Sequence, residues 1–304
     1  MATPTINLMT AARWNYHGVE RQIFATIWPH LPDGSWRRAP KALPAMLNFA
    51  LGIRTKADVL MSHGAADKLY LFMRDDTGER MINRFRHVFV PGTWLKERLS
   101  SAEGVTIPAS NIHIVGWPRL DPLVLKQREV DERRARFSRP RPHVLWAPTH
   151  DFRKRGPEQD STSTFPAFRP YLTALQKHCN VSVSLHPRNR WFKTPTEDLM
   201  IDADIVVSDF GTMVYEAWAL GKPVIFPRWI LADRVQTYLP GSAEAHIFEH
   251  RIGLHPNSPE EMLEMIQSRP SVDVRVKDFL ESYMPAELLG KSGAEVARTL
   301  VALA

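Results

Sequence analysis

The chain has 304 residues, of which 44% are hydrophobic and 24% are charged, and its formal net charge is +6. This is the composition of a globular protein long enough for two α/β domains of roughly 100–200 residues each. The single cysteine, Cys179, excludes an intramolecular disulfide framework and a cysteine-rich metal site, and it favours a reducing compartment.

Membrane and partner signals are weak along the whole chain. No stretch reaches the roughly 18–20 uninterrupted apolar residues of a transmembrane helix, and the start of the chain lacks a basic region followed by an apolar core. We therefore expect a cytoplasmic protein, either free or peripheral at the inner membrane face. The basic charge fits a solvated surface, phosphate-rich substrates, an anionic membrane or nucleic acid. Nucleic acid is disfavoured because the basic residues are scattered and no recognised motif is present.

In the first 50 residues, aromatic side chains are interrupted by prolines. Core packing with a proline-rich loop is favoured there over an amphipathic segment that lies on a membrane. From residue 58 onward, short apolar runs predict strands with helices or turns between them, the rhythm of an α/β fold. The predicted strands are 58–61, 87–90, 111–115, 143–148, 181–185, 205–207 and 224–226, and the predicted helices are 93–99, 168–178, 212–220, 259–266 and 292–303.

A change of composition marks the predicted domain boundary. Residues 125–142 are densely charged and end in two prolines, which is typical of a helix that runs into a domain connection. We predict an N-terminal domain over 1–124, a charged connection over 125–142 and a C-terminal domain over 143–304. Residues 152–165 are polar and aperiodic, so a loop is expected there.

The most informative stretch is DIVVSDFGTMVYEAWALGKPVIF, residues 204–226. A β-branched strand breaks at Ser208-Asp209-Phe210-Gly211, and an amphipathic helix follows that Gly221 and Pro223 end. A second apolar strand closes the unit, which implies a parallel sheet. The polar turn joins the carboxyl end of a strand to the amino end of a helix, where free N–H groups and the helix dipole favour anions. We expect this turn to hold the phosphates of a nucleotide-activated donor.

Two histidines also follow predicted strands. His63 lies in Ser62-His63-Gly64, where the glycine allows close backbone approach and the imidazole can point toward a ligand. His186 is followed by Arg188 after the strand at 181–185. The alternative for each histidine is a structural role in its turn.

Several common catalytic motifs are absent from the sequence. There is no HExxH, no carboxylate cluster and no Cys/His ligand spacing, so no catalytic metal and no tightly bound cofactor are expected. There is also no GxSxG, no Walker lysine loop and no GxGxxG. These absences argue against a serine hydrolase, a P-loop nucleotidase and a typical dehydrogenase.

Six stretches in colinear order resemble the CDP-glycerol glycerophosphotransferase family, the enzymes of teichoic-acid polymerisation and priming. They are SHG (62–64), GWPRLDPL (116–123), APTHD (147–151), LHP (185–187), ADIVVSDFGTMVYEAWALGKPVIF (203–226) and GKSGAEVA (290–297). The resemblance implies a GT-B fold, an α/β architecture of two Rossmann-like domains that face each other across a cleft. It also implies an N-terminal acceptor-side domain and a C-terminal domain that binds the nucleotide donor.

The implied reaction is attack by an acceptor hydroxyl on the β-phosphorus of CDP-glycerol, with CMP expelled. The acceptor would be a polyol phosphate or a glycan, free or lipid-linked. By resemblance His63 is the candidate base, and His186 with Arg188 would bind the pyrophosphate or the leaving group. The full set of candidate donor-binding residues is Gly64, Thr149, Arg188, Ser208, Asp209, Gly211, Thr212, Met213 and Glu216.

Some assignments stay open. Asp209 would bind ligand or hold the turn, and Glu216 would accept from ribose hydroxyls or serve the helix dipole. Thr212 would cap the helix or join the phosphate site. The family usually has a serine pair where this chain has Gly211-Thr212, which brings the turn closer to sugar-nucleotide enzymes. The alternative function is therefore a GT-B glycosyltransferase or a UDP-sugar 2-epimerase-like enzyme, and a non-catalytic binding module is the third.

Overall fold

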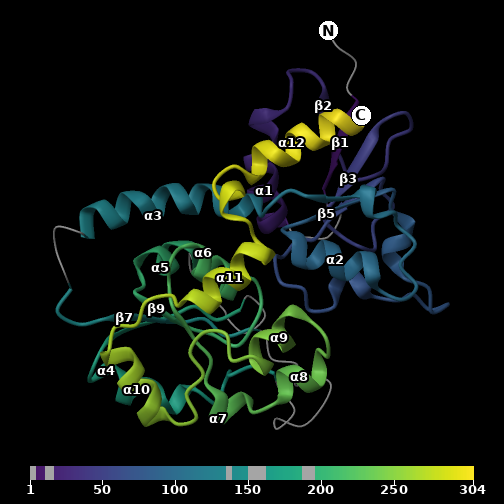
Figure 1. Ribbon diagram of the computed structural model, residues 1–304. Helices are drawn as coiled ribbons and strands as arrows, with labels where there is room; N and C mark the ends of the chain where they lie inside the picture. The colour runs from purple at the N-terminus through teal and green to yellow at the C-terminus, as the bar shows by residue number, and fades with distance from the viewer. Residues whose placement is uncertain (1–4, 11–16, 135–138, 150–161, 187–195) are drawn as a thin grey trace. The chain divides into compact units, whose positions relative to one another are not determined.

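The structure is a computed structural model that describes residues 5–10, 17–134, 139–149, 162–186 and 196–304 (Figure 1). The chain divides into two compact units. The first contains Met1–Ala65, Leu69–Val124 and Glu281–Ala304, and the second contains Ala66–Lys68 and Leu125–Leu280. Each unit holds a parallel sheet with helices, which confirms the predicted α/β class.

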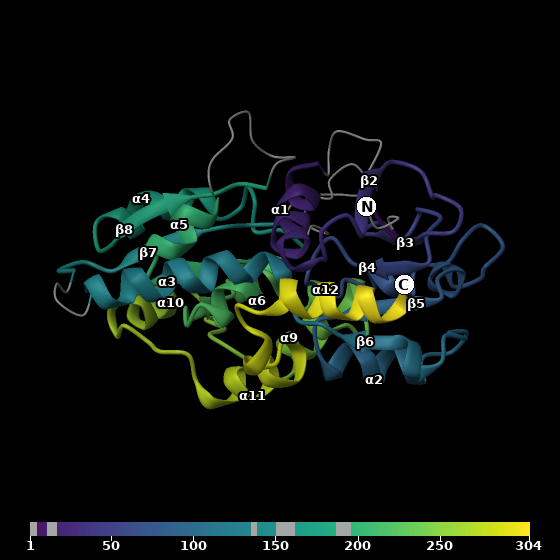
Figure 2. The same ribbon diagram turned by 90° about the horizontal axis from the view of Figure 1, so that it is seen from above.

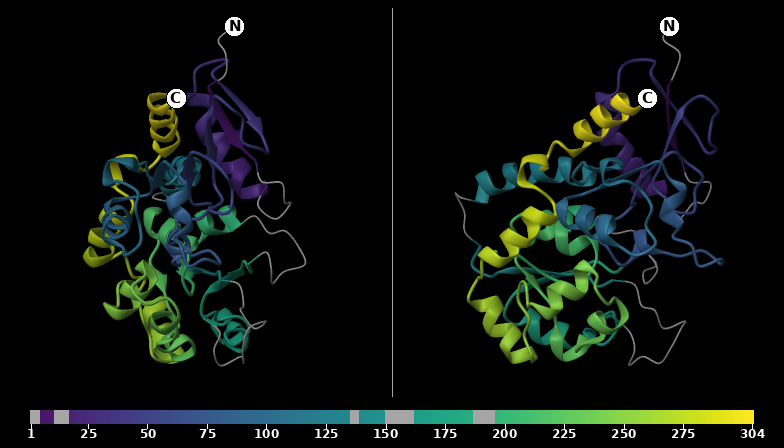
Figure 3. Two further views of the ribbon diagram at one scale, coloured as in Figure 1. Left: turned by 90° about the vertical axis from the view of Figure 1, so that its right-hand side faces the viewer. Right: turned by 45° about the vertical axis from the view of Figure 1, so that its right-hand side comes forward.

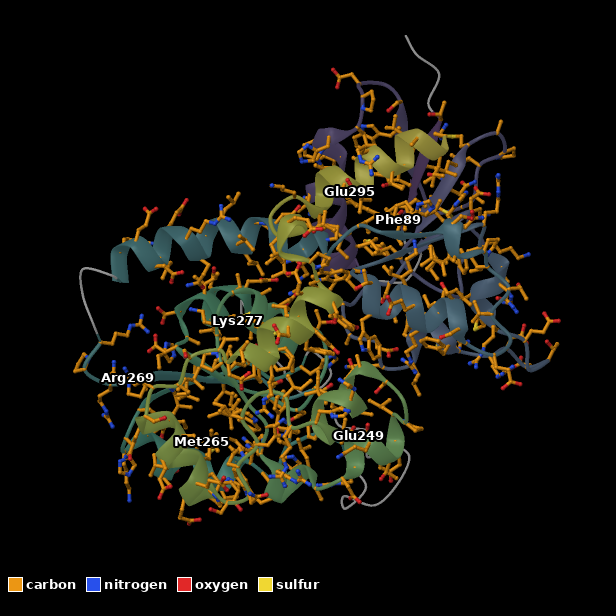
Figure 4. The ribbon with its side chains drawn as sticks, viewed as in Figure 1. Phe89, Glu249, Met265, Arg269, Lys277 and Glu295 are labelled. Atoms are coloured by element: carbon orange, nitrogen blue, oxygen red, sulfur yellow. The ribbon has the colours of Figure 1, made fainter. Side chains whose placement is uncertain are left out.

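The first unit is built on a six-stranded sheet in the order β2-β1-β3-β4-β5-β6, and all of its pairings are parallel. The central strands are mostly apolar and buried, and the ring of Phe89 in β5, labelled in Figure 4, contacts the rings of Phe49 and His113. β1 and β3 lie in the segment for which the sequence predicted no strand, and their complete burial shows that this segment belongs to the core. The strands are β1 (Ile6–Met9), β2 (Trp36–Ala39), β3 (Leu47–Ala50), β4 (Val59–Met61), β5 (His87–Val90) and β6 (Ile112–Ile114).

Three helices complete the first unit: α1 (His17–Ile27), α2 (Thr93–Ser101) and the closing helix α12 (Ser292–Leu303). α12 packs against α1 although the two are far apart in the sequence. Figures 2 and 3 show α12, in yellow, beside the purple segments of the same unit. The end of the chain thus completes the domain in which the chain begins.

The second unit has a four-stranded parallel sheet in the order β10-β9-β7-β8. β7 and β9 are wholly buried, while β8 is a more exposed edge strand. The strands are β7 (His143–Trp146), β8 (Asn180–Val183), β9 (Ile205–Val207) and β10 (Val224–Ile225). The helices are α4 (Leu172–Gln176), α5 (Thr196–Asp202), α6 (Thr212–Ala219), α7 (Arg228–Leu231), α8 (Arg234–Tyr238), α9 (Ala243–Glu249), α10 (Pro259–Gln267) and α11 (Val274–Tyr283).

The units differ from the predicted domains in two places. Glu281–Ala304 group with the first unit rather than the second, because α12 packs on α1. Ala66–Lys68 group with the second unit because their backbone is hydrogen-bonded there. The boundary after Val124 lies where the sequence placed it, and the expected charged helix is α3 (Asp121–Arg134), but this helix begins before the boundary.

No helix in the described part of the chain is both long enough and apolar enough to cross a bilayer. The predicted loop over 152–165 falls mostly outside the described residues, and its last four residues, 162–165, contain no helix or strand.

Candidate functional site

The predicted strand–turn–helix is present in the second unit. β9 ends at Val207, and α6 begins at Thr212 after a turn in which Gly211 has φ +105° and ψ −174°. This backbone conformation is open almost only to glycine. No side chain caps α6, so Thr212 is not a cap. Within the described ranges, no protein acceptor bonds the N–H groups of Thr212 and Met213. The turn therefore presents free backbone donors at the positive end of a helix.

The carboxylate and hydroxyls behind this turn hold the strand ends together. Ser208 is fully buried, and its hydroxyl donates to the carbonyl oxygen of Ala147 at 2.8 Å. Asp209 is also fully buried, and its Oδ2 accepts the N–H of Thr149 at 2.8 Å. These bonds join the end of β9 to the end of β7. The Asp209 carboxylate therefore holds the end of β7 rather than the backbone of its own turn, and its contact with a ligand stays a prediction.

Burial raises the pKa of Asp209 to about 6, against the lowering effect of Thr164 and of the Thr149 N–H. Oδ1 of Asp209 has no donor within hydrogen-bond geometry among the described residues. A buried carboxyl with one unsatisfied oxygen, next to a turn with free N–H groups, is an electrostatically unfavourable arrangement. Such perturbed groups are enriched at functional sites.

A residue that the sequence did not single out, Lys68, lies over the same turn. Its ammonium is 4.6 Å from the centre of the Phe210 ring and 3.4 Å from Oγ1 of Thr149. A Cβ atom added at Gly211 would lie 2.9 Å from Nζ of Lys68, so the ammonium occupies the space that a side chain at this position would need. The turn thus has a cation beside its free N–H groups, which is a complete chemical environment for a phosphate.

The other predicted site residues of α6 differ in burial. Thr212 is half-buried, and its Oγ1 accepts the N–H of Ala66 at 3.4 Å, while Met213 is half-buried. Glu216 is completely buried in the second turn of α6. It does not lie in the first helical turn, which removes the dipole role considered for it. Its ribose contact stays a prediction.

His63 and Gly64 lie in the first unit, in the turn after β4. The His63 imidazole packs edge-on against the Tyr70 ring with centroids 5.0 Å apart. The hydroxyl of Ser62 accepts the N–H of Gly64 at 3.2 Å. His63 is half-buried, so part of its side chain remains accessible.

His186 lies in the second unit, three residues beyond the end of β8, and is half-buried. Arg188 lies outside the described residues, so its pairing with His186 stays a prediction. Among the described residues, no three histidine, cysteine, aspartate or glutamate side chains come together as metal ligands.

The two parallel sheets with their helices define a GT-B fold. No family model matches the chain, and no curated protein matches it in sequence. Similarity is found among solved structures. The structure of the wall teichoic acid polymerase TagF is similar over 99% of this chain and 89% of that chain, with a TM-score of 0.64 and 14% identity.

A variant of TagF soaked with CDPG is similar over 98% of this chain and 88% of that chain, with a TM-score of 0.62 and 14% identity. The UDP-GlcNAc 2-epimerase of Methanocaldococcus jannaschii, in complex with UDP-GlcNAc and UDP, is similar over 99% of this chain and all of that chain. Its TM-score is 0.51 and its identity is 14%. At such identities the similarity establishes the fold, and function has to be argued from the site.

Proposed function

We propose that the protein is a GT-B transferase that uses a nucleotide-diphosphate donor. The observation that carries this proposal is the contact between the Lys68 ammonium and the Gly211 turn at the amino end of α6. Free backbone N–H groups, the positive end of a helix dipole and a cation belong to the same turn, and a pyrophosphate is a ligand that can use all three.

Within this class, we propose transfer of glycerol phosphate, or of a related polyol phosphate, from a CDP-linked donor. An acceptor hydroxyl oxygen forms a bond to the β-phosphorus, and the bond from that phosphorus to the bridging oxygen breaks. CMP leaves with the bridging oxygen, and the hydroxyl proton passes to a base. Little covalent chemistry is required of the protein, so positioned donors and one base are sufficient.

We assign the base role to His63 and a hydrogen bond to the pyrophosphate or leaving group to His186. Neutral imidazole is suited to a base near pH 7. Because His63 precedes Lys68 by only five residues, chain length alone keeps their Cα atoms within about 18 Å. The acceptor class that fits this role is a polyol phosphate or a glycan with a free hydroxyl group.

The test is product release from two donors. The protein is incubated with CDP-glycerol and a glycerophosphate-bearing acceptor, and in parallel with UDP-GlcNAc, and released CMP and UDP are measured. We expect CMP from the first mixture. His63→Ala should lower turnover by about 10²–10⁴-fold, the usual contribution of a general base. The exposed His178→Ala variant serves as the control and should keep full turnover.

One observation favours a second candidate, glycosyl transfer or 2-epimerisation of a UDP-sugar. The turn contains Gly211-Thr212 where the glycerophosphotransferases usually have a serine pair. UDP release, or epimerised product, without CMP release would replace the first candidate by the second. Thermal unfolding with each donor gives an independent measurement, because a ligand that binds the native state raises the midpoint.

A further inference from the structure

The three-residue segment Ala66–Lys68, which carries the ammonium described above, has an unusual backbone. Lys68 has φ +42°, and the next residue, Leu69, has φ +56°. Neither is a glycine, and two successive left-handed residues are unfavourable unless the surroundings fix them. The segment must therefore be held by specific contacts.

The main contact is the buried carboxylate of Glu244, near the start of α9. It accepts the N–H of Asp67 at 3.1 Å and the N–H of Lys68 at 2.9 Å, one on each oxygen. It also accepts the hydroxyl of Tyr215, at 2.8 Å, from α6. One side chain therefore joins the backbone beneath Lys68 to the helix whose amino end forms the phosphate turn.

A second carboxylate, that of Asp67, accepts a hydrogen bond from the backbone at the start of α9. Oδ2 of Asp67 accepts the N–H of Ala243, the first residue of α9, at 3.1 Å. Asp67 and Glu244 are 2% and 1% exposed. Burying two acidic side chains in one network is costly, even with hydrogen bonds and a helix amino end to offset it.

We infer that Glu244 is a positioning residue for donor binding: it fixes the backbone of Asp67 and Lys68 so that the Lys68 ammonium stays over the Gly211 turn. The inference rests on the proposed function and deepens it, since it names a second residue on which phosphate binding depends. Glu244 does not contact the ligand itself. It acts through Lys68, and this distinction can be measured.

The experiment is a double-mutant cycle on the full chain, with calorimetric binding of CDP, UDP and inorganic pyrophosphate as probes. Lys68→Met should weaken binding by about 10–100-fold, because a charge-assisted contact is lost. Glu244→Gln should weaken it by about tenfold, since a glutamine can accept only one of the two backbone N–H groups. In the Lys68→Met background, Glu244→Gln should change binding by less than about twofold.

The matched control is Glu249→Gln, which removes the same charge from the exposed end of α9, labelled in Figure 4. It should leave binding unchanged. Asp67→Ala provides a second variant that loosens the segment without altering Glu244, and it should resemble Glu244→Gln. It also keeps the inference testable if Glu244→Gln does not fold.

Two failures are distinguishable. If the wild-type protein binds the probes but Glu244→Gln and Lys68→Met are additive, Glu244 is structural only and the inference is overturned while the proposed function stands. If the wild-type protein binds none of CDP, UDP and pyrophosphate, the proposed function and the inference fall together.

Discussion

Helices α6 and α12 both begin after a glycine-containing turn, but different charged groups lie at their amino ends. At α12, the Asp121 carboxylate accepts the N–H of Ser292 at 3.1 Å and that of Gly293 at 2.7 Å. At α6, no side chain caps the helix, and the Lys68 ammonium lies beside the turn that precedes it. The first amino end is closed by an internal anion, and the second has a cation beside free donors.

The difference distinguishes a helix end with a structural role, that of α12, from a helix end that is a candidate ligand site, that of α6. Asp121 and Gly116 belong to GWPRLDPL, and Ser292 and Gly293 belong to GKSGAEVA, two of the stretches that carry the family resemblance. In the first unit they meet: a Cβ at Gly116 would overlap the Ser292 side chain, and one at Gly293 would overlap the Thr26 backbone. These motifs therefore build a close-packed junction, whereas the α6 turn is the place where we propose that a ligand binds.

The largest effect is expected from Gly293→Ala. The new methyl group would overlap the carbonyl oxygen of Thr26 in α1, and backbone atoms cannot move aside as a side chain can. Overpacking of this kind should lower the free energy of unfolding of the first unit by about 3 kcal/mol. Because the protein has two units, the loss is best measured by native-state hydrogen exchange of the α12 amides.

Gly18→Ala provides the control, since a methyl group there meets no atom within 4 Å and lies in α1, the same helix that contains Thr26. It should leave exchange unchanged or slightly slower. If Gly293→Ala changed the exchange of the α12 amides as little as Gly18→Ala does, the junction would not be close-packed. The amino end of α12 would then have no special structural role.

Asp121→Ala should have the next largest effect. Two N–H groups of α12 lose their acceptor, which should lower the stability of the first unit by about 2 kcal/mol at pH 5. Burial raises the pKa of Asp121 to about 6, against the lowering effect of the Gly293 and Ser292 N–H groups. A raised folded-state pKa means that stabilisation by this group is complete below about pH 4 and declines as pH rises through 6.

The difference between wild type and Asp121→Ala should therefore be larger at pH 4.5 than at pH 7.5, measured by urea unfolding or by α12 exchange. Glu129→Ala, an exposed acidic position on α3, should show no such dependence. An equal loss at both pH values would mean that the Asp121 carboxyl ionises as it does in the unfolded chain.

Several elements could be predicted from sequence because their signals are local. β5 and β9 are β-branched or aromatic runs bounded by turns, and α6 is delimited by Gly211 and Gly221. β1 and β3 could not be predicted, because Asn7 and Asn48 interrupt their apolar runs and prolines lie nearby in the sequence. The position of α12 in the first unit depends on its contact with α1, which lies more than 260 residues earlier in the sequence. No local sequence pattern can predict such a contact.

The same reason explains which site residues were found. Gly211 and Asp209 lie within one contiguous strand–turn–helix, so their place in the turn follows from spacing. Lys68, in contrast, depends on long-range contacts. Gly211 lies 143 positions after it in the sequence, and Glu244 lies 176 positions after it. The one local clue is a lysine soon after the Ser62-His63-Gly64 turn. A single lysine is too common for that clue to predict a site.

The smallest effect on stability is expected from Gly211→Ala, the counterpart of Gly293→Ala at the open helix end. Here the new methyl group would meet the end of a flexible lysine at 2.9 Å rather than a backbone carbonyl. The cost is mainly the strain of alanine at φ +105°, about 1.5 kcal/mol within the ~1–3 kcal/mol of such conformations.

Pyrophosphate binding should respond more strongly to Gly211→Ala than stability does. Displacing the Lys68 ammonium should weaken this binding by about tenfold. In the Lys68→Met background the same substitution should weaken binding much less, because the displaced charge is already gone. Undiminished pyrophosphate binding in Gly211→Ala would show that neither this turn nor the lysine above it binds phosphate, and α6 would then be an ordinary uncapped helix.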